Sequence, residues 1–249
     1  MKRLAAVVAL SLGLAHTCFA APLEIGALHF PPYYLVENGS TVTGGYLTYY
    51  IKKIFATAGL DYVFKGYPPK RLYLNVGNGT TQIWLGTIGV PEYEGKTLVS
   101  KKILAINLEV YSAGPAETLP KTLDDLKGKS VITIRGYAYG GMIFALQDPK
   151  NNIKLEIANS HATGFEMLRV GRADFLFDYI EPATETLANM NFPNVNKRSW
   201  KAIDIYFHVS KSLSDAQAIM DKLMKAHDAL TDEGYSITGT KVLLDSNDE

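Results

Sequence analysis

The sequence predicts an α/β protein with two lobes, on the basis of its alternating elements, its length and a polar break near its middle. Short apolar runs alternate with stretches of helical periodicity, which is typical of mostly parallel sheets flanked by helices. The 249 residues are enough for one large domain or two smaller domains with their own cores. Residues 112–115 (Ser-Ala-Gly-Pro) interrupt the alternation and favour two lobes.

Turn signals and periodicity define the elements before this break. The Pro31–Pro32 pair ends a first strand, and residues 37–40 (Glu-Asn-Gly-Ser) predict a hairpin turn. Apolar residues recur with helical spacing between residues 45 and 58, which predicts a helix packed on a sheet. We expect strands at residues 23–28, 62–64, 82–87 and 102–111, and helices at residues 45–58 and 69–76.

The same alternation resumes after the break. An amphipathic stretch at residues 215–230 places Ile219, Leu223 and Leu230 on one side of a helix, which we expect to return to the first lobe. We expect strands at residues 130–134, 153–157, 175–177 and 200–209, and helices at residues 123–126, 139–146, 162–170 and 215–230.

The first twenty residues predict a cleaved signal peptide and therefore a periplasmic protein. Lys2 and Arg3 precede an apolar run at residues 4–15, and small residues lead to an expected cleavage after Ala20. That run is too short to cross about 30 Å of hydrocarbon as a helix. Lipidation of Cys18 is the rival interpretation. Because Cys18 is the single cysteine, the cleaved chain would carry neither thiol nor disulfide.

Composition argues against several function classes. The 25 basic residues balance the 25 acidic ones, so we expect no basic face of the kind that nucleic-acid binding requires. The five histidines show no metal-ligand spacing, and no Gly-x-Ser-x-Gly nucleophile motif occurs in the sequence. We therefore expect no nucleic-acid partner, no metal, no cofactor and no enzymatic activity.

Two strand ends in the second half predict a ligand crevice. Arg135, Gly136 and Tyr137 follow one apolar strand, and Asp178 follows another. Open α/β sheets bind ligands beyond the carboxyl ends of their strands, so these residues should face one crevice. Arg135 could hold an anionic group beside the N–H groups of Gly136 and Tyr137, or be a surface arginine that pairs with the neighbouring lobe. Asp178 could meet a ligand or cap the following helix.

The order of several motifs resembles the bacterial extracellular solute-binding proteins of family 3, which include periplasmic amino-acid-binding components of ABC transporters. The motifs occur in the family's order and at its spacing, and they cover nearly the whole chain after residue 20. They are PPYY (31–34), GGYLTYYIKKIFATAGLDYVF (44–64), PPKR (68–71), TLDDLKGKSVITIRG (122–136), GRADFLFD (171–178) and SKSLSDAQAIMDKLMKAHDALTDEGY (210–235).

This resemblance implies a clamshell in which two hinge strands join the lobes and a ligand is clamped between them. It assigns residues 21–112 with 203–249 to lobe 1 and residues 113–202 to lobe 2, after a signal peptide at residues 1–20. It also implies that Asp178 meets a ligand amine, although Asp178 lies one residue closer to Asp174 than the family's commonest spacing.

One departure from the family concerns the ligand carboxylate. Members that bind amino acids carry a Thr-Pro-x-Arg element whose guanidinium grips the carboxylate bidentately. Here the corresponding stretch is GTIGVPEYEGK (86–96), with Tyr93 near the position of the arginine and no arginine in the segment. Arg71, which resembles the family's Trp/Pro-x-Arg element, and Arg135 are the two candidates to replace it.

Aromatic residues complete the predicted site. Tyrosine and tryptophan at strand ends suit an amine, a flat ring or a sugar-like ligand, because their faces are apolar and electron-rich. The resemblance implies that the aromatic residues after Pro31–Pro32 stack on the ligand. The predicted ligand-binding residues are Tyr33, Tyr34, Tyr67, Arg71, Trp84, Thr87, Arg135, Gly136, Tyr137, Tyr139 and Asp178.

The sequence thus predicts a monomeric periplasmic protein that captures a small polar ligand, amino-acid-like or amine-bearing, and presents it to a membrane permease. Two alternatives stay open. The same clamshell serves as a sensory module for a membrane receptor, and a few relatives of the fold are periplasmic enzymes such as dehydratases. Asp178 and Glu181 are three residues apart, which leaves acid–base chemistry open.

Overall fold

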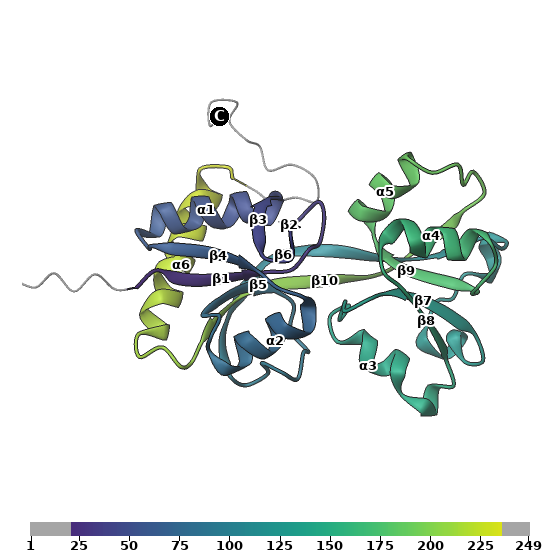
Figure 1. Cartoon of the computed structure of the whole chain (residues 1–249), viewed down its shortest axis with the longest axis horizontal. Coiled ribbons are helices and arrows are strands. Elements are labelled where there is room, and N and C mark those ends of the chain that lie inside the picture. Colours follow the sequence, from purple (N-terminus) through teal and green to yellow (C-terminus); the bar gives the residue numbers. More distant parts are fainter. Residues whose placement is uncertain (1–20, 236–249) are drawn as a thin grey trace, which may run out of the picture.

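The computed structural model describes residues 21–235 and shows two lobes joined by two long strands (Figure 1). These strands are β6 (Thr97–Ser112) and β10 (Asn196–Ser210), which pair antiparallel along their length. The predicted α/β fold, with two lobes and two connecting strands, is confirmed. The predicted signal peptide, Cys18 and the cleavage site at Ala20 lie outside the described residues.

Lobe 1 is built on three parallel strands in the order β4-β1-β5, with β10 added antiparallel beside β5. Helix α2 covers one face, and α1 and α6 pack together on the other (Figure 1). The elements are β1 (Leu23–Ala27), β2 (Leu35–Glu37), β3 (Thr41–Gly44), α1 (Tyr46–Ala58), β4 (Tyr62–Gly66), α2 (Pro69–Asn78), β5 (Ile83–Gly86) and α6 (Ala216–Asp232).

Lobe 2 repeats this plan with the parallel strands β9-β7-β8, and β6 lies antiparallel beside β9. Helices α4 and α5 lie on one side of these strands and α3 on the other (Figure 1). The elements are β7 (Ser130–Ile134), α3 (Met142–Gln147), β8 (Lys154–Ala158), α4 (His161–Arg169), β9 (Phe175–Tyr179) and α5 (Ile180–Ala188), with short 3₁₀ turns at Ala116–Thr118, Leu123–Leu126 and Pro149–Asn151.

The two connecting strands form the ribbon between the lobes. β5 of lobe 1 pairs with β10 at residues 206–209, and β9 of lobe 2 pairs with β6 at residues 108–111. Between these stretches, residues 105–107 of β6 pair with residues 202–204 of β10. No other described strand pairs with either of these two segments. Any hinge between the lobes must bend this two-stranded ribbon. The residue limits of the lobes stay a prediction.

The predicted elements are present, with two informative differences. The helix expected from residue 139 begins at Met142, because Tyr139, Gly140 and Gly141 have φ values of 50°, 60° and 82°. This left-handed backbone cannot continue a right-handed helix. Helix α5, directly after β9, was not among the residue ranges expected to be helical, although a helix that Asp178 could cap was considered.

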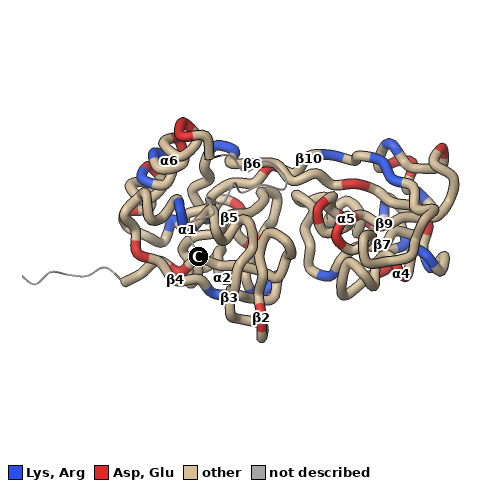
Figure 2. Tube along the Cα trace, turned by 90° about the horizontal axis from the view of Figure 1, so that it is seen from above, with Lys and Arg blue, Asp and Glu red and all other residues tan. Residues whose placement is uncertain are grey.

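Charge is distributed over the whole molecule. Lysine and arginine residues are scattered over both lobes beside aspartate and glutamate residues (Figure 2). Among the described residues 21–235, no helix combines the length and the apolar character needed to span a bilayer. The core runs through both lobes, and its largest side chains include Tyr33, Tyr139, Phe165 and Phe207.

Candidate ligand-binding site

A cavity lies where the carboxyl ends of the strands of both lobes meet. Its empty volume is about 490 Å³, a figure that includes open solvent at the mouth of the cavity. Ile106, Ile203 and Ile205 of the ribbon form its floor, and the remaining lining comes from the facing ends of the two lobes. None of the residues that line this cavity is charged.

Packing holds the lobe 1 wall, which we define as Tyr34 and Trp84. Their rings stack with centroids 5.6 Å apart and an interplanar angle of 24°. The Tyr34 hydroxyl donates to the Leu85 carbonyl oxygen over 2.9 Å. Gly86 leaves room for the indole, since a Cβ atom there would lie 2.2 Å from Trp84 ring atoms. The wall therefore requires glycine at residue 86.

Hydrogen bonds hold the lobe 2 wall, which we define as Tyr137, Tyr139 and Tyr179. Tyr139 and Tyr179 stack with centroids 5.6 Å apart at 22°. The Tyr139 hydroxyl accepts from the Ile134 N–H over 2.7 Å and donates to the Phe177 carbonyl oxygen over 3.3 Å. Burial raises the pKa of all three phenols, so they stay neutral.

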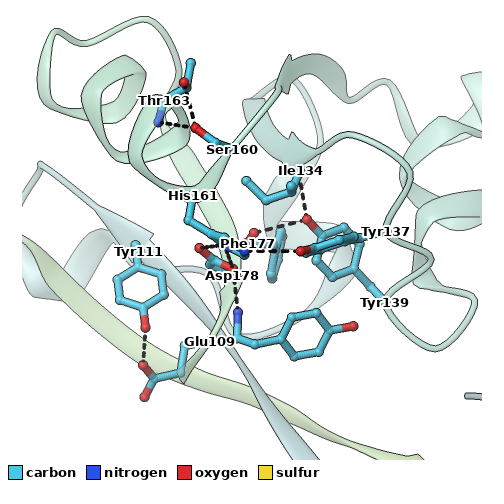
Figure 3. A network of polar contacts seen from close by, with 11 residues as sticks. Glu109, Tyr111, Ile134, Tyr137, Tyr139, Ser160, His161, Thr163, Phe177 and Asp178 are labelled. Carbon is cyan, nitrogen blue, oxygen red and sulfur yellow. Dashed lines mark hydrogen bonds and ion pairs between the residues drawn. The ribbon is translucent and has the colours of Figure 1, made fainter. Parts of the chain in front are cut away.

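A buried carboxylate and an imidazole lie behind the lobe 2 wall (Figure 3). His161 Nδ1 lies 2.9 and 2.8 Å from the two Asp178 carboxylate oxygens, and the Tyr179 N–H donates to Asp178 over 2.8 Å. The Tyr137 hydroxyl lies 3.1 Å from His161 Nε2. Asp178 is 0% exposed. Burial raises its pKa, and the hydrogen bonds from His161 and Tyr179 offset part of the rise.

The alternation of β9 separates Asp178 from the cavity. Consecutive strand residues point to opposite faces of a sheet, and Tyr179 lines the cavity whereas Asp178 does not. The carboxylate is directed instead to His161, at the start of α4. Any amine in the cavity is therefore separated from Asp178 by the tyrosine wall.

The lobes touch around the cavity, so the structure is a closed form. The Tyr73 hydroxyl, on α2 of lobe 1, donates to the Gly136 carbonyl oxygen of lobe 2 over 3.3 Å. The Phe30 ring meets the edges of Tyr137 and Tyr179, with centroids 5.0 and 5.1 Å apart. Contacts of this kind exist only while the lobes are together.

A further contact between the lobes joins Tyr33 to Glu181. Burial raises the pKa of Tyr33, and the nearby Glu181 carboxylate raises it further. Tyr33 follows β1 of lobe 1, and Glu181 lies in the first turn of α5 in lobe 2. The second carboxylate oxygen of Glu181, Oε2, is buried without a hydrogen-bond partner in the described part of the chain. Neither residue lines the cavity.

The structure brings together five of the eleven residues predicted for the site. The cavity is lined by Tyr34, Trp84, Thr87, Tyr137 and Tyr139. Tyr33 and Gly136 lie in contacts between the lobes, and Asp178 lies behind the lobe 2 wall. Ligand contact by any of the eleven stays a prediction.

The remaining three predicted residues also lie outside the cavity lining. Arg71 is exposed on α2, and Arg135 is exposed with its Nε donating to Asn159 Oδ1 over 2.7 Å. The Tyr67 hydroxyl donates to Glu24 Oε1 over 2.8 Å. Tyr67 and Arg135 both line a second groove between the lobes, beside His161.

The sequence prediction missed Phe30, Tyr73, Tyr179 and the ribbon isoleucines, all of which line the cavity. Tyr179 could have been found, because the alternation of a buried strand places the neighbour of Asp178 on the opposite face. Tyr73 could not, since it reaches the cavity from the middle of a helix. The described residues contain no group of three or more His, Cys, Asp or Glu side chains suited to a metal ion.

Comparison with known proteins places this geometry in a known fold. No family model and no curated protein matches the chain. A histidine kinase sensor domain with similarity to periplasmic binding proteins aligns with a TM-score of 0.69 and 16% identity, over 86% of this chain and 91% of that one. An ancestral arginine-binding protein bound to arginine gives 0.65 and 17%, over 86% and 93%. The chain has the type II periplasmic-binding-protein fold.

Another solved structure with this binding-protein fold is the substrate-binding protein of an amino acid ABC transporter. It aligns with a TM-score of 0.63 and 18% identity, over 86% of this chain and 95% of that chain. The alignments therefore cover nearly all of the described structure. At such identities the likeness concerns the fold, and the ligand must be inferred from the cavity itself.

Proposed function

We propose that this protein is a periplasmic solute-binding protein that captures a small molecule between its lobes and presents the closed form to a membrane partner. The observation that carries the proposal is the cavity, which both lobes line and which a two-stranded ribbon spans. A ligand held there contacts both walls only when the lobes are closed. Ligand binding therefore favours closure by its differential affinity for the two forms.

The required energies are modest. Every 1.4 kcal/mol of contact made only in the closed form changes the ratio of closed to open molecules about tenfold. Contacts between the lobes, such as the Tyr73–Gly136 hydrogen bond and the Phe30–Tyr179 ring contact, already favour closure. A ligand filling the cavity adds contacts to Trp84 on one side and Tyr139 on the other. A membrane partner can then recognise closure without touching the ligand.

The leading candidate for this partner is the permease of an ABC importer, with a membrane signalling receptor as the second. The same fold occurs in the substrate-binding protein of an amino acid ABC transporter and in a histidine kinase sensor domain. Co-purification from membranes with a permease, or with a kinase or cyclase, distinguishes the two.

A binding role is favoured over catalysis by the placement of the carboxylates. Asp178 is engaged by His161, and Glu181 meets Tyr33 at a contact between the lobes. Neither carboxylate lines the cavity, so the paired acid–base arrangement considered from the sequence does not face a bound molecule.

Small-angle X-ray scattering with a thermal-shift screen tests the proposal on residues 21–249. The panel contains amino acids, polyamines, aromatic acids and small sugars. A ligand of the native state raises the melting temperature by mass action, and the same compound should reduce the radius of gyration. A compound that stabilises the protein without compaction contradicts the clamp mechanism.

The two tryptophans provide a matched control for that screen. Trp84 lines the cavity, whereas Trp200 packs on Phe177 with centroids 4.9 Å apart and does not line it. W84A should weaken binding of the stabilising compound at least tenfold. W200F should leave its dissociation constant unchanged. Equal effects of the two substitutions would place the binding site elsewhere.

A further inference from the structure

We infer that the ligand of the cavity is an uncharged molecule with one six-membered ring, and that free amino acids and polyamines bind poorly. The inference rests on the proposed function, because it names the ligand class of the same cavity. Three properties of the cavity carry it: the absence of charge in its lining, the orientation of its aromatic pairs, and its size.

The first property is the neutral lining. A zwitterionic amino acid needs a cationic group for its carboxylate and an anionic group for its amine. Arg71 and Arg135 are exposed and do not line the cavity. Tyr93, in the segment where an arginine was sought, donates its hydroxyl to the Thr87 carbonyl oxygen over 2.6 Å. Residues 21–235 present no side-chain cation to a carboxylate in this cavity.

The Asp178 carboxylate is likewise not accessible to a ligand amine. Both Asp178 oxygens are engaged by His161, and the carboxylate is 0% exposed behind Tyr179. To bind an amine it would have to exchange His161 for the ligand and displace the tyrosine wall. Removing one partner from this buried hydrogen-bonded pair leaves the other partner buried without compensation. An amine that stays on the tyrosine faces meets no carboxylate in the cavity lining, so it has no counter-charge there.

The second property is the arrangement of the aromatic rings. One stacked pair, Tyr34 with Trp84, comes from lobe 1, and another, Tyr139 with Tyr179, comes from lobe 2. Both pairs line the same cavity above the apolar floor of Ile106 and Ile203. A flat ring between two aromatic walls gains stacking and burial on both of its faces. The same walls contain no charged group that could accept hydrogen bonds from the several ammonium groups of a flexible polyamine.

The third property is size. In the closed form, about 50 Å³ of the cavity is open to the centres of water molecules. One water needs roughly 10–15 Å³ by this measure, so the space holds a few waters or one small ring. The lining includes neutral hydroxyl groups, among them those of Thr87 and Tyr179. A single uncharged polar group on the ring, such as a hydroxyl, can therefore be accommodated.

The test uses four compounds that share one phenol ring and differ in charge: p-cresol, tyramine, 4-hydroxyphenylacetate and L-tyrosine. Isothermal titration calorimetry on residues 21–249 measures each dissociation constant, and small-angle scattering measures compaction. We expect p-cresol to bind at least tenfold more tightly than each of the charged analogues and to compact the protein. We expect W84A to lose this binding and W200F to keep it.

A second variant tests the reason for the preference. Tyr179→Asp places a carboxylate on the face of β9 that lines the cavity, so tyramine should then bind at least tenfold more tightly than p-cresol. Retained preference for p-cresol in the folded variant overturns the argument from charge. Thermal unfolding of the variant shows whether it is folded, and the comparison in the unsubstituted protein does not depend on it.

The outcomes separate the ligand class from the binding function. Tighter binding of tyramine, 4-hydroxyphenylacetate or L-tyrosine with compaction overturns the inference and leaves the binding function intact. Compaction by a sugar or a polyamine, with no response to p-cresol, does the same. Absence of compaction with every compound in this series and in the wider screen counts against both.

Discussion

The two walls of the cavity hold their aromatic rings by different means. In lobe 1, Trp84 is held by the space above Gly86 and by stacking on Tyr34. In lobe 2, Tyr137 and Tyr139 are held by hydrogen bonds, and a buried pair, Asp178 with His161, lies behind them. The difference shows that a buried carboxyl group beside a ligand cavity can hold the aromatic wall in place instead of contacting the ligand.

This difference has an energetic consequence. A ring held by packing tolerates changes that preserve volume, and it fails when an atom is added in its space. A ring held through a buried hydrogen-bonded pair fails when one partner is removed, because the other partner stays buried without compensation. Substitutions should therefore act on the two walls in distinguishable ways.

The largest expected effect is in lobe 2. D178A leaves His161 and the Tyr179 N–H without their acceptor in a site that is 0% exposed, so the free energy of unfolding should fall by about 3–5 kcal/mol. Urea denaturation followed by circular dichroism measures the change. The control D124A removes an exposed ion pair with Lys127 and should cost less than about 1 kcal/mol. A loss as small as the control would show that Asp178 is not part of the wall's support.

The next effect concerns a histidine in lobe 1 that has no carboxylate partner. His208 is 1% exposed, and its Nδ1 lies 3.1 Å from the Thr97 hydroxyl. Burial lowers its pKa from 6.5 to about 4. Below pH 6.5 the unfolded chain therefore takes up a proton that the folded protein refuses, and stability falls as the pH drops. The loss between pH 6.5 and pH 4 should reach about 3 kcal/mol.

H208Q tests this, because glutamine cannot titrate in that range. The variant should lack the part of the pH dependence that His208 causes, so its unfolding free energy should fall less steeply than that of the unsubstituted protein. H29Q, which replaces an exposed histidine, is the control for removing an imidazole. Parallel pH profiles for H208Q and the unsubstituted protein would be evidence against a neutral, buried His208.

The lobe 1 wall should respond to a single methyl group. G86A places a Cβ 2.2 Å from Trp84 ring atoms, so the indole must move, at a cost of about 1–3 kcal/mol. Binding of the compound found by the thermal-shift screen should weaken in parallel. G114A is the control, since a Cβ there meets its nearest atom at 3.4 Å. If G86A behaved like G114A, the position of Trp84 would not depend on this glycine.

The sequence predicted the fold better than it predicted the site, for a physical reason. Periodicity reports burial within one element, and it correctly located β7, which ends shortly before Tyr137, and β9, which contains Asp178. It does not report which face of a strand end meets the other lobe. The one-residue difference between Asp178 and the commonest family spacing was the relevant signal, because it places Tyr179 at the family's usual acidic position. The left-handed turn at Tyr139–Gly141 and the approach of Tyr73 from α2 depend on tertiary packing.

The smallest expected effect concerns a contact between the lobes that involves neither wall. Y73F removes the hydrogen bond from the Tyr73 hydroxyl to the Gly136 carbonyl oxygen, which is 3.3 Å long and exists only when the lobes are together. A net loss of about 0.5–1.5 kcal/mol is expected, which shifts the closed-to-open ratio by up to about tenfold. Single-molecule fluorescence with one dye on each lobe measures this ratio, and Y49F, on the outer face of α1, is the control. An unchanged ratio in Y73F would mean that other contacts, such as the ring packing at Phe30, hold the lobes closed.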